Sequence, residues 1–195
     1  MDIKVVGVIG AGTMGNGIAQ VFAQSGFRVT LVDVASPMLD RARGAIDKSL
    51  SKFVDKAIIS AADRDAALGR LTTTTMIDQL GEVDYVVEAI VEHAETKRGL
   101  FTQLDALTKP DAILSSNTSS ISITLLGAAT SRPDKVLGMH FMNPVPLMKL
   151  VELVRGQTTG EPAMATARSC AAHSAKWPSK RPTIRGSSRI ACCCP

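Results

Sequence analysis

The sequence predicts an α/β fold built on a doubly wound, mostly parallel sheet with helices on both faces. An apolar segment at residues 5–9 is followed at once by a glycine-rich turn and a helical pattern. Short apolar runs then alternate with helical patterns as far as residue 141, which is typical of parallel strands joined by crossover helices. The run Val83–Val91 is mostly apolar and is broken by Glu88, as expected for a parallel strand buried on both faces.

The helices are predicted from apolar spacing and from the residues that start or stop them. Gly26 ends the first helix, Ser36 and Pro37 suit the N-cap and first position of the second, and Ser60 can cap a third that Gly69 ends. The predicted helices are Met14–Ser25, 38 to about 56, 60–68 and Ala94–Leu107, and the predicted strands are 5–9, Arg28–Val34, Arg70–Thr75, Val83–Val91, Ala112–Ser116 and Val136–Phe141. Because two helices fall between the second and third strands, we expect a helical hairpin that projects from the sheet edge.

The turn after the first strand carries the spacing Gly-x-Gly-x-x-Gly, and Asp33 closes the second strand. Gly10 permits a tight turn, Gly12 permits close approach of a pyrophosphate, and Gly15 lets the helix pack on the strand. The helix N-terminus then faces the phosphates. A carboxylate at Asp33 would accept from ribose hydroxyls and repel a 2′-phosphate, so we expect a Rossmann-type site for NAD rather than NADP. The cofactor-binding residues predicted here are Gly10, Gly12, Met14, Gly15 and Asp33.

Composition excludes several other classes of protein. All 18 acidic residues lie in 1–168 beside 17 basic ones, whereas 169–195 holds five basic residues and no acid, so the net charge of +4 belongs to the tail and does not indicate a nucleic-acid partner. No run is long and apolar enough to span a bilayer, and the first strand begins without an export leader, so we expect a cytoplasmic enzyme with no membrane partner. The four cysteines all lie in the tail without metal-ligand spacing, so no metal site is expected.

Three polar segments fall at predicted strand ends, where open α/β sheets bind ligands. They are 87–92 (VEAIVE), 115–120 (SSNTSS) and 138–152 (GMHFMNPVPLMKLVE). With the turn GAGTMG, these motifs resemble the NAD-binding half of the 3-hydroxyacyl-CoA dehydrogenase family, in its 3-hydroxybutyryl-CoA dehydrogenase branch. The resemblance runs from Val5 to about Arg155 and is specific, because four motifs match in order.

The resemblance implies roles for individual residues. His140 would be the general base, since imidazole titrates near neutrality, and Glu152 would be the partner acid that holds the ring. Ser119 would hydrogen-bond the substrate oxygen. The remaining implied contacts are Glu92, Lys97, Asn117 and Asn143 with the cofactor, and Ser49 and Lys56 with the CoA of an acyl-CoA substrate.

Plainer interpretations exist for the same residues. A histidine at a strand end is often structural, a Ser/Thr/Asn-rich loop is often only a turn, and a charged helix such as that of Ser49 and Lys56 is often only solvated. Glu88 and His93 are interpreted as structural or surface residues. The predicted function is NAD-dependent oxidation of a (3S)-3-hydroxyacyl-CoA, or the reverse. The alternatives are a non-catalytic dinucleotide-binding fragment, and a dehydrogenase of a free β-hydroxyacid, for which we find no pairing of a catalytic lysine with a carboxylate-binding arginine.

The composition changes abruptly after Arg168, which predicts a dinucleotide-binding domain over 1–168 and an aberrant, disordered tail over 169–195. We hypothesise that this tail is translated in a shifted frame, because one codon choice in the shifted frame turns Ala175–Pro195 into a sequence that resembles the family's continuation. The family's helical second domain, which carries its dimer interface and a catalytic asparagine, is then missing. We therefore expect the chain not to dimerise and its turnover to be impaired.

Overall fold

The structure, a computed structural model, describes residues 2–174 and 183–187. Its strands in this part of the chain are β1 (Val5–Ile9), β2 (Arg28–Val32), β3 (Leu71–Thr74), β4 (Tyr85–Glu88), β5 (Ile113–Ser116), β6 (Val136–Phe141), β7 (Leu150–Arg155) and β8 (Thr183–Ser187). Its helices are α1 (Thr13–Gln24), α2 (Ser36–Asp55), α3 (Ala61–Gly69), α4 (Ala94–Leu107), α5 (Ile123–Gly127) and α6 (Glu161–Ser174), with short 3₁₀ turns at Ile77–Leu80 and Pro133–Lys135.

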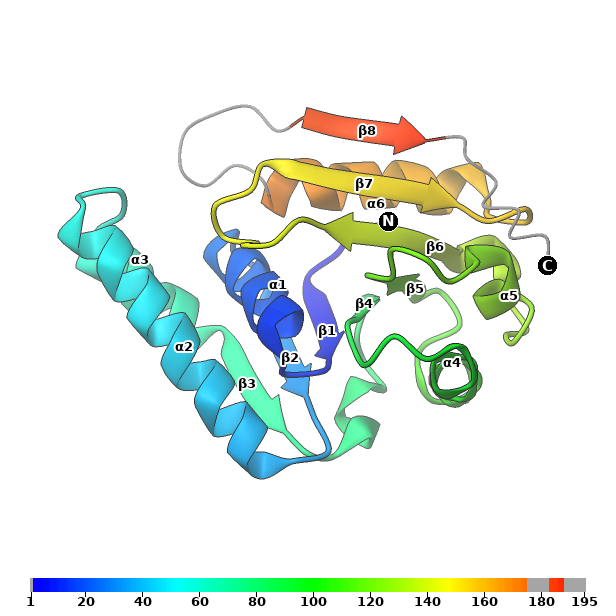
Figure 1. Cartoon of the computed structure of the whole chain (residues 1–195), viewed down its shortest axis with the longest axis horizontal. Helices are drawn as coiled ribbons and strands as arrows, with labels where there is room; N and C mark the ends of the chain where they lie inside the picture. The colour runs from blue at the N-terminus through cyan, green and yellow to red at the C-terminus, as the bar shows by residue number, and fades with distance from the viewer. Residues whose placement is uncertain (1, 175–182, 188–195) are drawn as a thin grey trace.

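The strands form one sheet in the order β3-β2-β1-β4-β5-β6-β7-β8 (Figure 1). The first six strands in this order, from β3 at the edge to β6, are parallel to one another. β7 runs antiparallel to β6, and β8 runs parallel to β7. The chain leaves β1 toward β2 and β3 and returns to β4 on its other side, so the strand order reverses between β1 and β4. This confirms the predicted doubly wound, mostly parallel sheet, and it places the topological switch point at β1 and β4.

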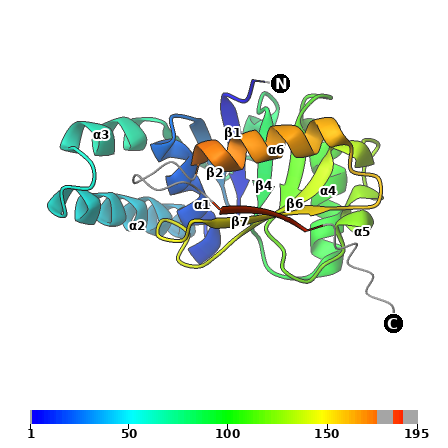
Figure 2. The ribbon, with the colours of Figure 1, turned by 90° about the horizontal axis from the view of Figure 1, so that it is seen from above.

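Two apolar cores cover the two faces of the sheet. One joins α1, α2 and α6 to the sheet and includes the fully buried Ile18, Phe22 and Ala167. The other joins α4 and α5 to the opposite face and includes the fully buried Phe101 and Leu126. Figure 2 shows α6 lying across the sheet. The prediction of helices on both faces is confirmed.

The predicted helical hairpin is present as α2 and α3, which pack on α1 and extend beyond the sheet at the left of Figure 1. Ser60 caps α3 as predicted, because its Oγ accepts from Asp63 N at 3.1 Å and the Asp63 carboxylate accepts from Ser60 N at 3.0 Å. The predicted N-cap at Ser36 is wrong by one residue. Ala35 is the N-cap and Ser36 is already helical, because Pro37 is accepted anywhere in the first turn.

The predicted boundary at 168/169 is also wrong, because α6 continues through 169–174. Its buried residues are Ala163, Met164, Ala167, Cys170 and Ala171, which recur with helical spacing. Most of these residues are small, so the apolar side of the helix is a weak signal in the sequence. Residues 183–187 form β8 against β7, whereas the remaining tail, including Cys192–Cys194, lies outside the described residues.

Within the described ranges, no helix combines the length and the apolar character that crossing a bilayer requires.

Candidate active site

A cleft of about 840 Å³ opens at the carboxyl ends of β1, β2 and β4, at the switch point of the sheet. Its walls are the turn between β1 and α1, the residues that follow β2, β3 and β4, and the side of α4 that carries Thr96, Leu100 and Gln103. Gly10, Gly12, Met14 and Asp33 line it, as the sequence predicts for a dinucleotide. The location agrees with the general position of ligands in open α/β sheets.

The three glycines of the turn are required for different physical reasons. Gly10 has a φ of +98°, and a Cβ there would lie 2.6 Å from the Ala89 carbonyl oxygen. A Cβ at Gly15 would lie 1.6 Å from the Gly10 carbonyl oxygen, so α1 can cross β1 only without a side chain. At Gly12 a Cβ would have no neighbour within 4 Å among the described residues, and no side chain caps α1 there. The N-terminus of α1 is therefore open where a pyrophosphate would fit.

Asp33 is held at the end of β2 by the backbone. Its Oδ2 accepts from Ala11 N at 2.7 Å, and its Oδ1 accepts from Ala35 N at 3.0 Å. These bonds tie the carboxylate to the glycine-rich turn while it stays partly exposed on the cleft. Together with the open helix N-terminus, this donor and acceptor set fits the diphosphate and ribose of a dinucleotide.

A second pocket of about 330 Å³ continues from the first, and the two share Met14, Ala89 and Ile90. It brings together many residues that are far apart in the sequence. Those that the sequence predicts for the site are Met14, Glu92, Lys97, Asn117, Ser119, His140 and Asn143.

The antiparallel register of β6 and β7 places His140 directly opposite Glu152. His140 Nδ1 lies 3.1 Å from Glu152 Oε2, with the imidazole 23% and the carboxylate 38% exposed. A carboxylate can only accept, so Nδ1 carries the proton of this bond and Nε2 is the nitrogen left for a ligand. The imidazole lines the second pocket, which gives that pocket a base with an oriented ring.

Asn117 links the end of β5 to the strand that carries His140. Its Oδ1 accepts from Phe141 N at 2.8 Å, and its backbone N donates to the Glu88 carbonyl oxygen at 2.8 Å. Because the side-chain oxygen is used in this way, the NH₂ group is the part of the amide suited to a ligand in the pocket. Ser119 is exposed on the same wall.

Lys97 is only 1% exposed and lies between two carboxylates. Its Nζ is 2.5 Å from Glu88 Oε1 and 3.2 Å from Glu92 Oε2. Burial tends to raise the pKa of Glu92, but hydrogen bonds from Thr118 and Ser120 and the charge of Lys97 outweigh it and lower that pKa. The structure therefore shows Lys97 as the centre of an ionic cluster as well as a residue of the pocket wall.

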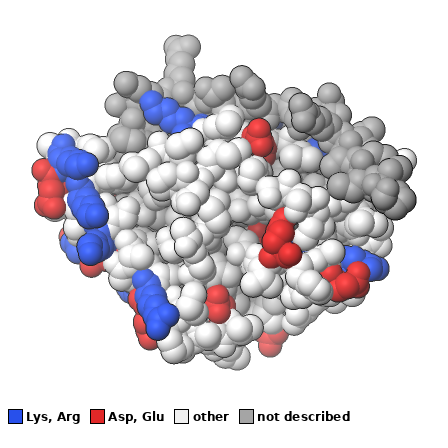
Figure 3. All heavy atoms as spheres, in the orientation of Figure 1, with Lys and Arg blue, Asp and Glu red and all other residues white. Residues whose placement is uncertain are grey.

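The structure does not bring Ser49 and Lys56 into either pocket. Ser49 lies within α2, and Lys56 is the C-cap of the same helix. Their separation of seven residues puts them on the same side of the helix, and Lys56 is exposed. Figure 3 shows basic side chains gathered along the left edge of the molecule, where Figure 1 places the α2–α3 hairpin.

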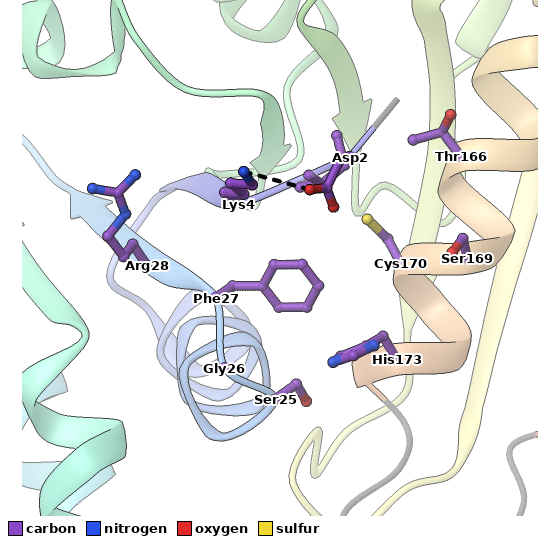
Figure 4. Close-up of a pocket in the computed structure, with 11 residues that line it drawn as sticks. Asp2, Lys4, Ser25, Gly26, Phe27, Arg28, Thr166, Ser169, Cys170 and His173 are labelled. Carbon is purple, nitrogen blue, oxygen red and sulfur yellow. Dashed lines mark ion pairs between the residues drawn. The ribbon is translucent and has the colours of Figure 1, made fainter.

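A third pocket, of about 340 Å³, lies at the start of β1 and β2 beside α6 (Figure 4). None of the predicted site residues lines it, and the Asp2–Lys4 ion pair and the edge contact of Phe27 with His173 occupy its walls. Burial, and secondarily the charge of Asp84, raise the pKa of its Cys170 thiol to about 12, so this thiol is a poor nucleophile. The described residues hold no group of three or more His, Cys, Asp or Glu suited to a metal ion.

Sequence reasoning missed the importance of Glu88 and Thr118. Glu88 is fully buried and accepts from Lys97, from Ser116 Oγ at 2.6 Å and from Ile90 N at 2.7 Å. Thr118 is buried and donates a short hydrogen bond to Glu92. The signal for Glu88 was its place as a lone acid in an apolar strand, because a charge is seldom buried without partners.

A dinucleotide cleft that leads into a pocket with an oriented imidazole defines the cofactor domain of a nicotinamide-dependent oxidoreductase. Comparison with known proteins gives the particular family. Residues 5–180 match the family described as 3-hydroxyacyl-CoA dehydrogenase, NAD binding domain. The chain belongs to the 3-hydroxyacyl-CoA dehydrogenase family, and its cofactor is NAD.

Individual relatives agree with this assignment. The chain is 53% identical over 155 residues to a probable 3-hydroxybutyryl-CoA dehydrogenase of Deinococcus radiodurans, covering 80% of this chain and 55% of that protein. It is 50% identical over 159 residues to a 3-hydroxybutyryl-CoA dehydrogenase of Bradyrhizobium diazoefficiens, covering 82% and 54% respectively. The crystal structure of FadB2 of M. tuberculosis superposes with a TM-score of 0.90 at 41% identity, covering 96% of this chain and 64% of that one. The chain thus spans about half the length of the first two relatives.

Proposed function

We propose that this chain carries the cofactor and proton-transfer machinery for NAD-dependent oxidation of a (3S)-3-hydroxyacyl-CoA to the 3-oxoacyl-CoA, or for the reverse reaction. The observation that carries the proposal is the His140–Glu152 pair at 3.1 Å in a pocket continuous with the dinucleotide cleft. A short acyl group, as in 3-hydroxybutyryl-CoA, is supported by the names of the relatives.

The chemistry of the chain's own residues follows from this geometry. Bound NAD supplies the acceptor for the hydride that leaves the carbon bearing the hydroxyl group. His140 takes the hydroxyl proton at Nε2, and the Glu152 carboxylate stabilises the imidazolium that results. Ser119 hydrogen-bonds the substrate oxygen and orients it toward His140. In the reverse direction the protonated His140 returns the proton to the same oxygen.

The remaining predicted residues would hold the two ligands. Gly10, Gly12, Met14, Gly15 and Asp33 would form the cleft for the adenosine and diphosphate, and Glu92, Lys97, Asn117 and Asn143 would surround the nicotinamide half. Ser49 and Lys56 would contact the CoA from the α2–α3 hairpin, where a lysine meets phosphate as a point charge.

A second function is non-catalytic binding of the dinucleotide. The observation that favours it is the exposure of the catalytic pair, 23% for His140 and 38% for Glu152, because proton and hydride transfer are faster in a site closed to water. We further propose that 169–195 is frame-shifted, that the chain does not dimerise, and that it resides in the cytoplasm.

The test is the change in NADH absorbance with acetoacetyl-CoA, on the 195-residue chain and on a version with the frame restored from codon 169. His140→Gln should lower turnover by about 10²–10⁴-fold without weakening NADH binding. Wild-type rates for His140→Gln in an active chain would overturn the assignment of the base. Activity in the restored version alone would favour the non-catalytic fragment as the function of this chain.

A further inference from the structure

The buried carboxylate of Glu88 has an electrostatic role in addition to its role in packing. We propose that Glu88 is a positioning residue that neutralises Lys97, so that Glu92 presents an uncompensated negative charge to the pocket and favours the oxidised, cationic nicotinamide over the reduced, neutral one. The inference rests on the proposed function, since it places the nicotinamide in the pocket lined by His140.

The charge of each member follows from its partners. Glu88 is fully buried, and the partners that the structure gives it are all donors: Lys97 Nζ at 2.5 Å, Ser116 Oγ at 2.6 Å and Ile90 N at 2.7 Å. A carboxylate can accept from all three of these donors at once. The three partners come from α4, from the end of β5 and from the residues after β4, so Glu88 joins the elements that build the pocket.

Lys97 has an acceptor for each of its three protons. These are Glu88 Oε1 at 2.5 Å, Glu92 Oε2 at 3.2 Å and the Ile90 carbonyl oxygen at 3.4 Å. The shortest contact is the one with Glu88, and both of those side chains are almost completely buried. Lys97 is therefore compensated mainly by Glu88, although it also lines the pocket.

Glu92 differs from Glu88 in its exposure. Its carboxylate is 41% exposed and lines the pocket, while Thr118 and Ser120 donate to its Oε1. The cluster of two carboxylates and one ammonium thus carries a net charge of −1, and the exposed member of the cluster bears it. If Glu88 carried no charge, the positive charge of Lys97 would instead neutralise the negative charge of Glu92.

The position of the nicotinamide follows from the cleft. Asp33 and the open N-terminus of α1 fix the adenosine and diphosphate end, so the other nucleoside must pass Met14 into the pocket of His140 and Glu92. A carboxylate in the wall of that pocket attracts the positive ring of NAD⁺ and has no comparable effect on the neutral ring of NADH. Glu152 adds a second negative charge behind His140, and this charge is the same in every variant below.

The test measures the dissociation constants of NAD⁺ and NADH on the 195-residue chain, by calorimetry and by NADH fluorescence, without any turnover. Glu92→Gln should lower the ratio Kd(NADH)/Kd(NAD⁺) by about fivefold, the order of effect of one charge at the distance of a pocket wall. Glu88→Gln should lower the ratio equally although residue 88 is buried, because Lys97 then cancels Glu92. The double variant Glu88→Gln/Lys97→Met removes one charge of each sign and should restore the wild-type ratio.

Glu95→Gln is the matched control, because Glu95 lies on α4 close to Lys97 but pairs with Arg98 outside the pocket. It should leave the ratio unchanged. If Glu88 served only to hold the fold, Glu88→Gln would weaken both cofactor forms equally, and an unchanged ratio would overturn the inference. If Glu88→Gln alone does not fold, Glu92→Gln must still lower the ratio and the double variant must keep it, and equal ratios in these two overturn the inference. A wild-type chain that binds neither form would overturn the proposed function together with the inference.

Discussion

His140 lines the second pocket, and Glu152 is the partner that orients its ring. The Glu152 carboxylate at 3.1 Å from Nδ1 selects the tautomer in which Nε2 can accept a proton. Glu152→Gln keeps the shape of the side chain but removes the charge that stabilises the imidazolium. We expect kcat to fall by about 10²-fold or more with little change in KM, measured by steady-state NADH absorbance in the frame-restored version. Glu161→Gln, on an exposed acid that pairs with Arg155 and Arg168, is the control and should have no effect.

Asp33 combines a structural and a selective part. Its two oxygens bind Ala11 N and Ala35 N, and the carboxylate still faces the cleft. Asp33→Asn retains one acceptor and removes the charge that would repel a 2′-phosphate. We expect the affinity for NAD to fall by about tenfold while that for NADP changes less, so that the preference for NAD narrows. Titration with both cofactors checks this, and Asp40→Asn on the exposed side of α2 is the control. An undiminished preference would show that Asp33 does not select the cofactor.

At the scale of elements, the β1–α1 turn separates the requirements of folding from those of binding. A Cβ at Gly15 would be 1.6 Å from a backbone oxygen, whereas one at Gly12 would meet nothing within 4 Å among the described residues. Gly15→Ala should therefore cost several kcal/mol of unfolding free energy, because α1 must move off β1. Gly12→Ala should leave the melting temperature within a few degrees of wild type but weaken NAD binding by tenfold or more, because the methyl group takes the space of the diphosphate. Equal melting temperatures for the two variants would contradict this account.

The elements that the sequence predicted best are those with strong local signals. α4 was predicted to the residue, because its apolar spacing is regular, and β6 was also predicted to the residue, because its apolar run is short and bounded. The sequence does not predict β7, although Val151 and Leu153 alternate with the half-exposed Glu152, because so short an alternation is a weak local signal. α6 was cut short because its buried residues are mostly small. In both cases tertiary contacts decided a segment whose local pattern was weak.

The candidate site was predictable in its members and less so in its connections. Motifs in order along the chain identified the residues that line the second pocket, since parallel strands bring their carboxyl ends to one edge. The pairing of His140 with Glu152 was implied by the family resemblance alone, because it depends on the register of β6 and β7, which no spacing in the sequence reveals. The hydrogen bonds of Glu88 depend on three elements that meet only in the folded chain. The one sequence signal for them is an acidic residue alone in an apolar strand.

On the scale of the whole molecule, the site lies at the carboxyl ends of the strands, and two ion pairs join segments at their amino ends. Asp84, just before β4, accepts from Lys4 N and Val5 N and pairs with Lys109 at 2.6 Å. Asp105, near the end of α4, pairs with Arg132 at 2.7 Å, and both side chains are largely buried. Arg132 also donates to the carbonyl oxygens of the last turn of α4, so it fastens that helix to the segment that precedes β6.

The ion pairs of Asp84 and Asp105 make the stability of the molecule depend on pH. Burial tends to raise the pKa of Asp84 and of Asp105, but their hydrogen bonds and the nearby cations outweigh it and hold both pKa values below the ordinary 3.8. A carboxyl group whose pKa is lower in the folded state stabilises the fold at any pH above its unfolded pKa, and that stabilisation is lost as the pH falls through the folded value. The free energy of unfolding should therefore be flat near neutrality and decline below about pH 4.

Asp105→Asn separates this effect from general acid unfolding. At pH 7 it leaves the guanidinium of Arg132 buried without its anionic partner, and we expect a loss of about 2–3 kcal/mol in the free energy of unfolding by urea. Because the variant has no proton to bind at residue 105, its stability should decline less steeply than that of wild type between pH 5 and pH 3, so that the two curves converge. NAD binding at pH 7 should be unchanged, since Asp105 lies outside both pockets of the site. Parallel curves over that range would show that Asp105 has the same pKa in the folded and unfolded chain.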